Sequence, residues 1–196
     1  MSDTSLLDAW RAGDEASGQA LFKRHFSSLY RFFRNKVGDD CDDLIQRTFL
    51  AVLKGLDGFR GHSSFRTYLF VIARHELYRY LRGLHRDQER FDPEHQTLEG
   101  LAPSPSSDAA RAELETIVLD ALRRISVDMQ VALELHYWED LTTRELAETL
   151  EVPESTVKSR IQRGRVALDK EIRRALRRAG LVGDDAAIEA ALGLAP

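Results

Sequence analysis

The sequence contains, at residues 142–161, the stretch TTRELAETLEVPESTVKSRI, which indicates two short helices joined by a tight turn. Thr142 and the glutamate three residues later have the spacing of a capping box, in which both side chains satisfy backbone groups at a helix start. Pro153 suits the first turn of a second helix, where its missing N–H costs no hydrogen bond. Val157 and Ile161 lie four residues apart and are expected to face inward. The stretch therefore predicts a helix-turn-helix.

The charges around this stretch favour a nucleic-acid partner, although the whole chain carries a formal net charge of -4. Residues 113–157 carry 3 basic and 11 acidic side chains, whereas residues 158–178 carry 9 basic and 2 acidic ones. A module polarised in this way presents one positive face, which is the electrostatic footprint of phosphate binding. A solvated basic helix in a plain helical hairpin is the alternative, but the turn, the paired apolar positions and the polarity occur together here. The second helix is therefore expected to lie in a major groove, with Thr156, Lys158, Ser159, Gln162 and Arg163 facing outward and Arg160 and Arg165 on its flanks.

The first 84 residues also read as helix, because apolar residues recur there at three- and four-residue spacing. One amphipathic helix is expected around residues 21–33, a second from about Asp42, and a third from about Phe65 to Leu84. Strand-like alternation is absent from the sequence, so we expect an all-α fold of two small helical domains. Cations interleaved with rings can pair with phosphates and stack on exposed bases. Such a stripe lies opposite the apolar face of the third helix and consists of Arg74, His75, Tyr78, Arg79 and Arg82.

The composition between the two helical regions indicates a linker. Residues 85–112 contain three prolines and little apolar periodicity, and a coil of that length averages roughly 30 Å end to end. Ser126, inside the second module, is a suitable N-cap for the helix that follows it. We therefore expect modules at residues 1–84 and 113–179, a flexible linker at 85–112 that acts only as a tether, and a short acidic tail at 180–196.

Composition narrows the class of protein further. Hydrophobic residues make up 43% of the chain, which is ordinary for a folded protein. The single cysteine, Cys41, excludes an internal disulfide, and the N-terminus lacks the pattern of a signal peptide, so a cytoplasmic location is expected. The six histidines show no metal-ligand spacing, and neither a glycine-rich phosphate loop nor a nucleophile elbow occurs. We therefore expect no catalytic residue, metal, cofactor or membrane insertion.

Two groups of motifs resemble the sigma factors of the extracytoplasmic-function (ECF) type. The resemblance covers about residues 14–84 and 113–175, with the motifs in the family's order. The motifs are residues 43–49 (DLIQRTF), 59–61 (FRG), 64–69 (SFRTYL) and 72–74 (IAR) in the first module, and residues 141–150 followed by 155–161 (STVKSRI) in the second.

This resemblance implies a sigma factor that binds core RNA polymerase and promoter DNA, with an anti-sigma protein as a further candidate partner. The clamp helices of the largest polymerase subunit would contact Asp43, Gln46 and Arg47, and the flap of the second-largest subunit would contact the second module. The melted minus-ten element would contact Gly61, His62, Ser63, Ser64, Phe65, Tyr68, Arg74, His75, Tyr78, Arg79 and Arg82. The minus-thirty-five element would contact Ser155, Thr156, Lys158, Ser159, Arg160, Gln162, Arg163 and Arg165.

Some positions depart from the family's usual residues. Arg47 stands at a usual glutamate, Tyr68 at a usual tryptophan and His75 at a usual asparagine, and Arg79 replaces a usual aspartate. The polymerase contact and the minus-ten preference are therefore expected to differ locally. Gly164 replaces a usual alanine, at a cost of about 1 kcal/mol in helix propensity. The alternative function is a stand-alone regulator with a helix-turn-helix and a helical effector domain, which would not need a clamp-binding motif beside an aromatic loop.

Overall fold

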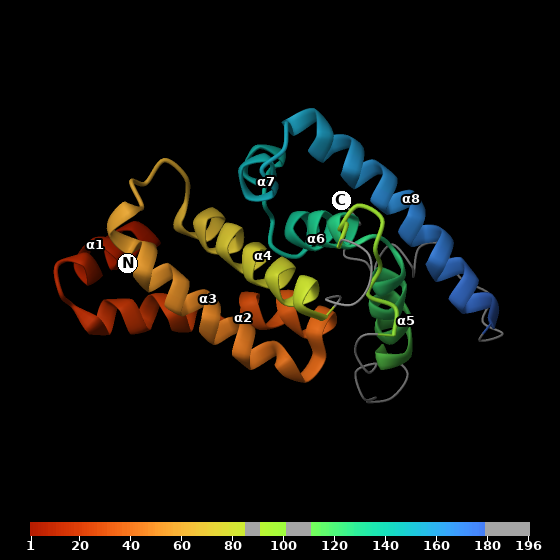
Figure 1. Cartoon of the computed structure of the whole chain (residues 1–196), viewed down its shortest axis with the longest axis horizontal. Coiled ribbons are helices and arrows are strands. Elements are labelled where there is room, and N and C mark those ends of the chain that lie inside the picture. The colour runs from red at the N-terminus through yellow and green to blue at the C-terminus, as the bar shows by residue number, and fades with distance from the viewer. Residues whose placement is uncertain (85–90, 101–110, 179–196) are drawn as a thin grey trace.

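The computed structural model describes residues 1–84, 91–100 and 111–178, and its regular elements are helices (Figure 1). No helix in these ranges is long and apolar enough to cross a membrane. The all-α fold of two helical domains is confirmed. The first module contains α1 (Asp3–Arg11), α2 (Glu15–Val37), α3 (Cys41–Gly55) and α4 (Phe65–Leu84), with 3-10 turns at Gly38–Asp40 and Leu56–Gly58. The second contains α5 (Arg111–Arg124), α6 (Val127–Tyr137), α7 (Thr143–Leu150) and α8 (Glu154–Arg178).

In the first module, α2, α3 and α4 pack around fully buried leucine and phenylalanine side chains. Phe33 of α2, Leu44 of α3 and Leu77 of α4 are each 0% exposed. Burying apolar side chains of this size stabilises each helix far more than its intrinsic propensity does. The limits of α4, Phe65 and Leu84, are those that the periodicity predicts.

Helix α1 is not apparent from the sequence, because only Leu6 and Leu7 of its nine residues are buried. Its attachment to α2 depends on Asp3, which accepts a hydrogen bond from Arg24 at 2.6 Å and lies 2.7 Å from Nε2 of His25. Such a short helix is marginal in isolation, so tertiary contacts must hold it in place.

In the second module the helix-turn-helix forms as predicted. The capping box is present, with the backbone N–H of Glu145 donating to Oγ1 of Thr142 at 3.2 Å. Helix α7 ends at Leu150, and the next residue, Glu151, caps it with a left-handed backbone at φ 57°. Val157 and Ile161 are buried, which fixes the rotation of α8 about its axis.

Gly164 has a packing reason that its helix propensity does not reveal. A Cβ at this position would lie 3.3 Å from the side chain of Leu133, a tight contact that would require this leucine to shift by a few tenths of an ångström. The unfavourable propensity is therefore offset by contact between the two helices.

Residues 91–100, here called the strap, lie against the second module. Leu98 is 1% exposed, and its N–H donates to the carbonyl of Arg123 at 2.9 Å. The carbonyls of two other strap residues, Pro93 and Gln96, accept from the first two N–H groups of α6 at 3.0 and 2.9 Å. The strap therefore satisfies the N-terminus of α6, whereas the hydroxyl of Ser126, expected to do so, makes no capping bond.

The strap falls within the segment expected to be an uncontacted tether. Its docking leaves no trace in apolar periodicity, because it combines backbone carbonyls, a few apolar side chains and ion pairs of Glu94 and Glu99 with distant arginines. The remaining parts of that segment, residues 85–90 and 101–110, and the acidic tail at 180–196 lie outside the described residues.

The two modules also pack against each other, with α7 beside α4 and α5 beside α2 (Figure 1). This arrangement differs from two modules that are connected only by a tether. It places the helix-turn-helix directly against the helix that carries the basic and aromatic stripe.

Candidate nucleic-acid interface

The outward face of α8 is a row of exposed polar and basic side chains. Val157 and Ile161 hold the opposite face against the core, so the direction of this row is fixed. Thr156 is half-buried, and the exposed residues are Ser155, Lys158, Ser159, Gln162, Arg163 and Arg165.

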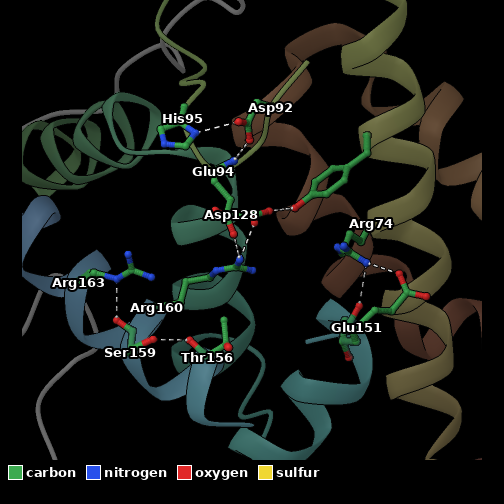
Figure 2. A network of polar contacts seen from close by, with 12 residues as sticks. Arg74, Asp92, Glu94, His95, Asp128, Glu151, Thr156, Ser159, Arg160 and Arg163 are labelled. Atoms are coloured by element: carbon green, nitrogen blue, oxygen red, sulfur yellow. Dashed lines mark hydrogen bonds and ion pairs between the residues drawn. The ribbon is translucent and has the colours of Figure 1, made fainter. Parts of the chain in front are cut away.

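The contacts that these side chains make are local to the helix. The hydroxyl of Ser159 donates to the carbonyl of Thr156 at 2.9 Å, and Nε of Arg163 approaches the carbonyl of Ser159 at 3.4 Å (Figure 2). Lys158 forms an exposed ion pair with Glu154 at 2.9 Å. Exposed pairs of this kind are weak, so the side chains can turn toward a ligand at little cost.

Arg160 does not belong to this row. It is 5% exposed, and its guanidinium lies 2.8 Å from both Asp128 and Glu94 (Figure 2). Placing it on a flank was wrong, because it lies three residues after Val157 and one before Ile161, on the buried side of the helix. It ties α8 to α6 and to the strap.

The stripe on α4 is divided between the second module and solvent. Arg74 lies 2.9 Å from Glu151 and stacks 4.8 Å from the ring centroid of Tyr78, and His75 lies 3.0 Å from the same carboxylate. The other two members remain accessible: Arg79, which pairs with Glu76 at 2.5 Å, and Arg82.

Tyr78 points into the contact between the modules. The residue is 8% exposed, and its hydroxyl donates a hydrogen bond to Asp128. Burial, and then the carboxylate of Asp128, raise the pKa of Tyr78 above its ordinary value, so the hydroxyl keeps the proton that it donates. The expectation that this ring faces away from the protein is wrong for the arrangement seen here.

The loop before α4 combines exposed and buried residues. Gly61 adopts φ 72°, a left-handed conformation that favours glycine, and His62 and Ser64 are exposed. The hydroxyl of Ser64 accepts from the N–H of Thr67 at 3.0 Å and so caps α4, and Ser63 is half-buried.

The aromatic residues of this region brace the loop. Phe65 is 4% exposed and its ring lies 5.5 Å from that of His25, so it does not offer a free surface to a base. Tyr68 is half-buried and stacks on Phe59 at 4.6 Å. Arg11 of α1 donates to the carbonyl of Phe59, a contact that the sequence did not suggest because α1 itself was not expected.

A second exposed surface lies on α3. Asp43 and Arg47 form an ion pair at 2.7 Å, with each side chain about half exposed, and Gln46 lies exposed between them. Leu50 and Leu53 continue the same helix and are 47% and 44% exposed. Exposed leucines next to polar residues favour a protein-binding surface. Leu50 was not singled out in the sequence, because a lone apolar residue outside the main stripe carries little signal.

Within the described ranges, no group of three or more histidine, cysteine, aspartate or glutamate side chains could hold a metal ion.

Comparisons with known proteins bear on both modules. Residues 21–87 match the family model of Sigma-70 region 2, and residues 115–168 match that of Sigma-70, region 4. Together the two matches cover more than half of the chain. The ECF RNA polymerase sigma-E factor of Haemophilus influenzae is 27% identical over 183 residues, which are 88% of this chain and 96% of that protein. The RNA polymerase sigma-H factor of Pseudomonas aeruginosa is 28% identical over 189 residues, covering 90% and 97%.

Two solved structures are similar in fold. The structure of CnrH in complex with the cytosolic domain of CnrY has a TM-score of 0.65 at 23% identity, covering 87% of this chain and 96% of that one. The sigma factor RpoE in complex with the anti-sigma factor NepR from Bartonella quintana has a TM-score of 0.58 at 22% identity, covering 75% and 91%.

Proposed function

Because the chain belongs to the sigma-70 family, and to its ECF type, we propose that it recognises a promoter with two surfaces, one on each module. The chain is a sigma factor, which binds core RNA polymerase and directs promoter-specific initiation of transcription. Residues 1–84 would bind the polymerase and the minus-ten element, and residues 113–179 the minus-thirty-five element.

The exposed face of α8 carries the proposal for duplex DNA. Short hydroxyls lie near its N-terminus and amide and guanidinium groups lie further along, which suits base edges in a major groove. Lys158, Gln162 and Arg163 are the proposed readers, with Ser155, Thr156 and Ser159 beside them and Arg165 at the phosphate backbone. Arg160 is left out of this set because its guanidinium is buried.

The loop at residues 61–64 and the stripe on α4 are the proposed surface for the melted minus-ten strand. Arg79, Arg82 and His62 are accessible as the protein stands, and so is the side chain of His75, although it pairs with Glu151. Arg74 and Tyr78 would join them once the second module moves away. Phe65 and Tyr68 would hold the loop in shape.

The face of α3 is the proposed contact with the clamp helices of the largest polymerase subunit. Asp43, Gln46 and Arg47 supply its polar groups, and Leu50 and Leu53 supply exposed apolar area next to them. The flap of the second-largest subunit would contact the second module. A protein that acts on DNA together with RNA polymerase would work in the cytoplasm, where Cys41 would stay reduced.

Transcription in vitro tests this function. The purified chain and bacterial core RNA polymerase are incubated with a library of promoters, and the 5′ ends of the transcripts are mapped. We expect transcripts that depend on the chain and start downstream of a shared two-part sequence. A stand-alone regulator, the alternative function, would bind DNA without the polymerase and give no such transcripts.

A further inference from the structure

Carboxylates of the second module contact the cationic side of the first. Glu139 is 3% exposed, and its carboxylate accepts hydrogen bonds from Arg31 of α2 at 2.6 Å and from Arg66 of α4 at 2.8 Å. These arginines lie 108 and 73 residues away from it in the sequence. Two guanidinium groups that converge on one buried carboxylate form strong charge-assisted hydrogen bonds.

Glu151 and Asp128 contact the stripe itself. Glu151 lies against Arg74 (Figure 2) and against His75, and Asp128 accepts from the hydroxyl of Tyr78. The cation of Arg74 is only partly satisfied, because its Nε is buried without a hydrogen-bond partner among the described residues. A phosphate that approached the guanidinium with bidentate geometry would fit it better than Glu151 does.

We propose that in the free protein Asp128, Glu139 and Glu151 take the places of nucleic-acid phosphates on the first module and so keep a melted strand off α4. These three carboxylates are called the acidic face below. The idea rests on the proposed role of the α4 stripe in strand binding. It also gives a role to three of the 11 acidic side chains in residues 113–157.

The contact between the modules, here called closure, covers only one of the two proposed DNA-binding surfaces. The face of α8 that carries Lys158, Gln162 and Arg163 is exposed in the same arrangement in which Tyr78 is buried. The closed protein therefore keeps its duplex-reading residues accessible while it covers Arg74 and Tyr78 of the strand-binding stripe. Single-stranded DNA is the ligand that closure excludes.

The contact between the modules can open again because it buries an ion pair whose desolvation is unfavourable. Lys36 is 0% exposed, forms an ion pair with Glu134 of the second module and donates to the carbonyl of Phe32 at 2.6 Å. Burial lowers the pKa of Lys36 below its ordinary value, and the carboxylate of Glu134 offsets only part of this shift. Removing two charges from water can cost more than their attraction returns, and opening rehydrates both. A partner such as core polymerase can therefore separate the modules.

The test measures binding of a fluorescein-labelled, random-sequence single-stranded DNA pool by the full-length free protein. The opened variant combines Glu139→Gln with Glu151→Gln, which keeps side-chain shape and removes two charges. The control is Glu148→Gln, which removes one charge and is matched to Glu151→Gln alone, because Glu148 lies on α7 but pairs only weakly, at 3.8 Å, with Arg144 of the same helix. Glu151→Gln alone changes an exposed position. It replaces the double variant in the assay if circular dichroism shows that the double variant is unfolded.

Closure is followed separately by energy transfer between dyes on Lys23→Cys and Lys170→Cys, with Cys41→Ala. We expect the opened variant to lose transfer and to bind the pool about tenfold more tightly, since apparent affinity scales with the open fraction. The control should match the unmodified protein. An equal gain in the control would overturn the proposal, because general charge would then explain it.

The two possible failures are distinguishable. Unchanged transfer in the opened variant would show that the acidic face does not hold the modules together. Lost transfer without a gain in strand binding would overturn both the masking and the proposed role of the stripe. Adding Arg74→Gln to the opened variant should remove the gain.

Discussion

Replacing Arg160 by methionine should destabilise the protein without directly removing a DNA contact. The guanidinium is the main partner of Asp128, whose side chain is 8% exposed, so Arg160→Met leaves a carboxylate that is buried and nearly alone. Removing one partner of a buried ion pair costs about 3–5 kcal/mol. The low end, about 3 kcal/mol, is expected because Asp128 keeps the hydroxyl of Tyr78 and because Glu94 is 61% exposed. In a chain of this size that corresponds to a fall in Tm of roughly 6–12 °C.

Urea unfolding of Arg160→Met and of the matched variant Arg163→Met measures the effect. Arg163 is exposed on the same helix, so its replacement should change stability by less than about 0.5 kcal/mol while weakening binding to promoter duplex. The reasoning is refuted if Arg160→Met is as stable as the unmodified protein and loses sequence preference as Arg163→Met does.

Three further outcomes are expected. Asp43→Ala with Gln46→Ala should weaken assembly with core polymerase while the circular dichroism spectrum stays unchanged, and unaltered affinity for the polymerase would contradict the assignment of α3. Arg163→Ala should lose roughly 1–3 kcal/mol of discrimination between minus-thirty-five sequences, and a pre-melted promoter bubble should not restore it. Tyr78→Ala should impair promoter opening, and the same bubble should largely rescue that defect. Equal rescue of both variants would count against two separate surfaces. Acid should loosen the contact between the modules: burial raises the pKa of Glu139, but hydrogen bonds from Arg66, Ser28 and Arg31 bring it below the ordinary 4.5. Stabilisation by Glu139 is thus present above pH 4.5 and lost as the pH falls through the lowered pKa, so energy transfer between the modules should drop there, and less steeply in Glu139→Gln.

The sequence predicts the structural features that depend on residues only a few positions apart. The capping box at Thr142, the inward side of α8 at Val157 and Ile161, and the limits of α4 each follow from spacings of three or four positions. At that range the geometry of the helix alone decides which residues share a face.

The features that the sequence did not indicate depend on residues far apart in the chain. Tyr78 looks exposed on a helical wheel, but contacts with Asp128, 50 residues away, and with the ring of Phe91 bury it. Phe65 looked available to a base, yet it packs on His25 of another helix. Polar groups that pair across modules have no periodic signature, because either partner alone resembles an ordinary surface residue.

The docked strap shortens the connection between the modules. Leu84 ends α4, and the docked part of the chain begins at Phe91, so while the strap stays in place seven residue steps join the two, a contour of at most about 25 Å. The full segment between the modules would reach several times further. The two promoter elements must then lie within a narrow range of separations along the DNA, and spacer length becomes a determinant of which promoters the protein can use.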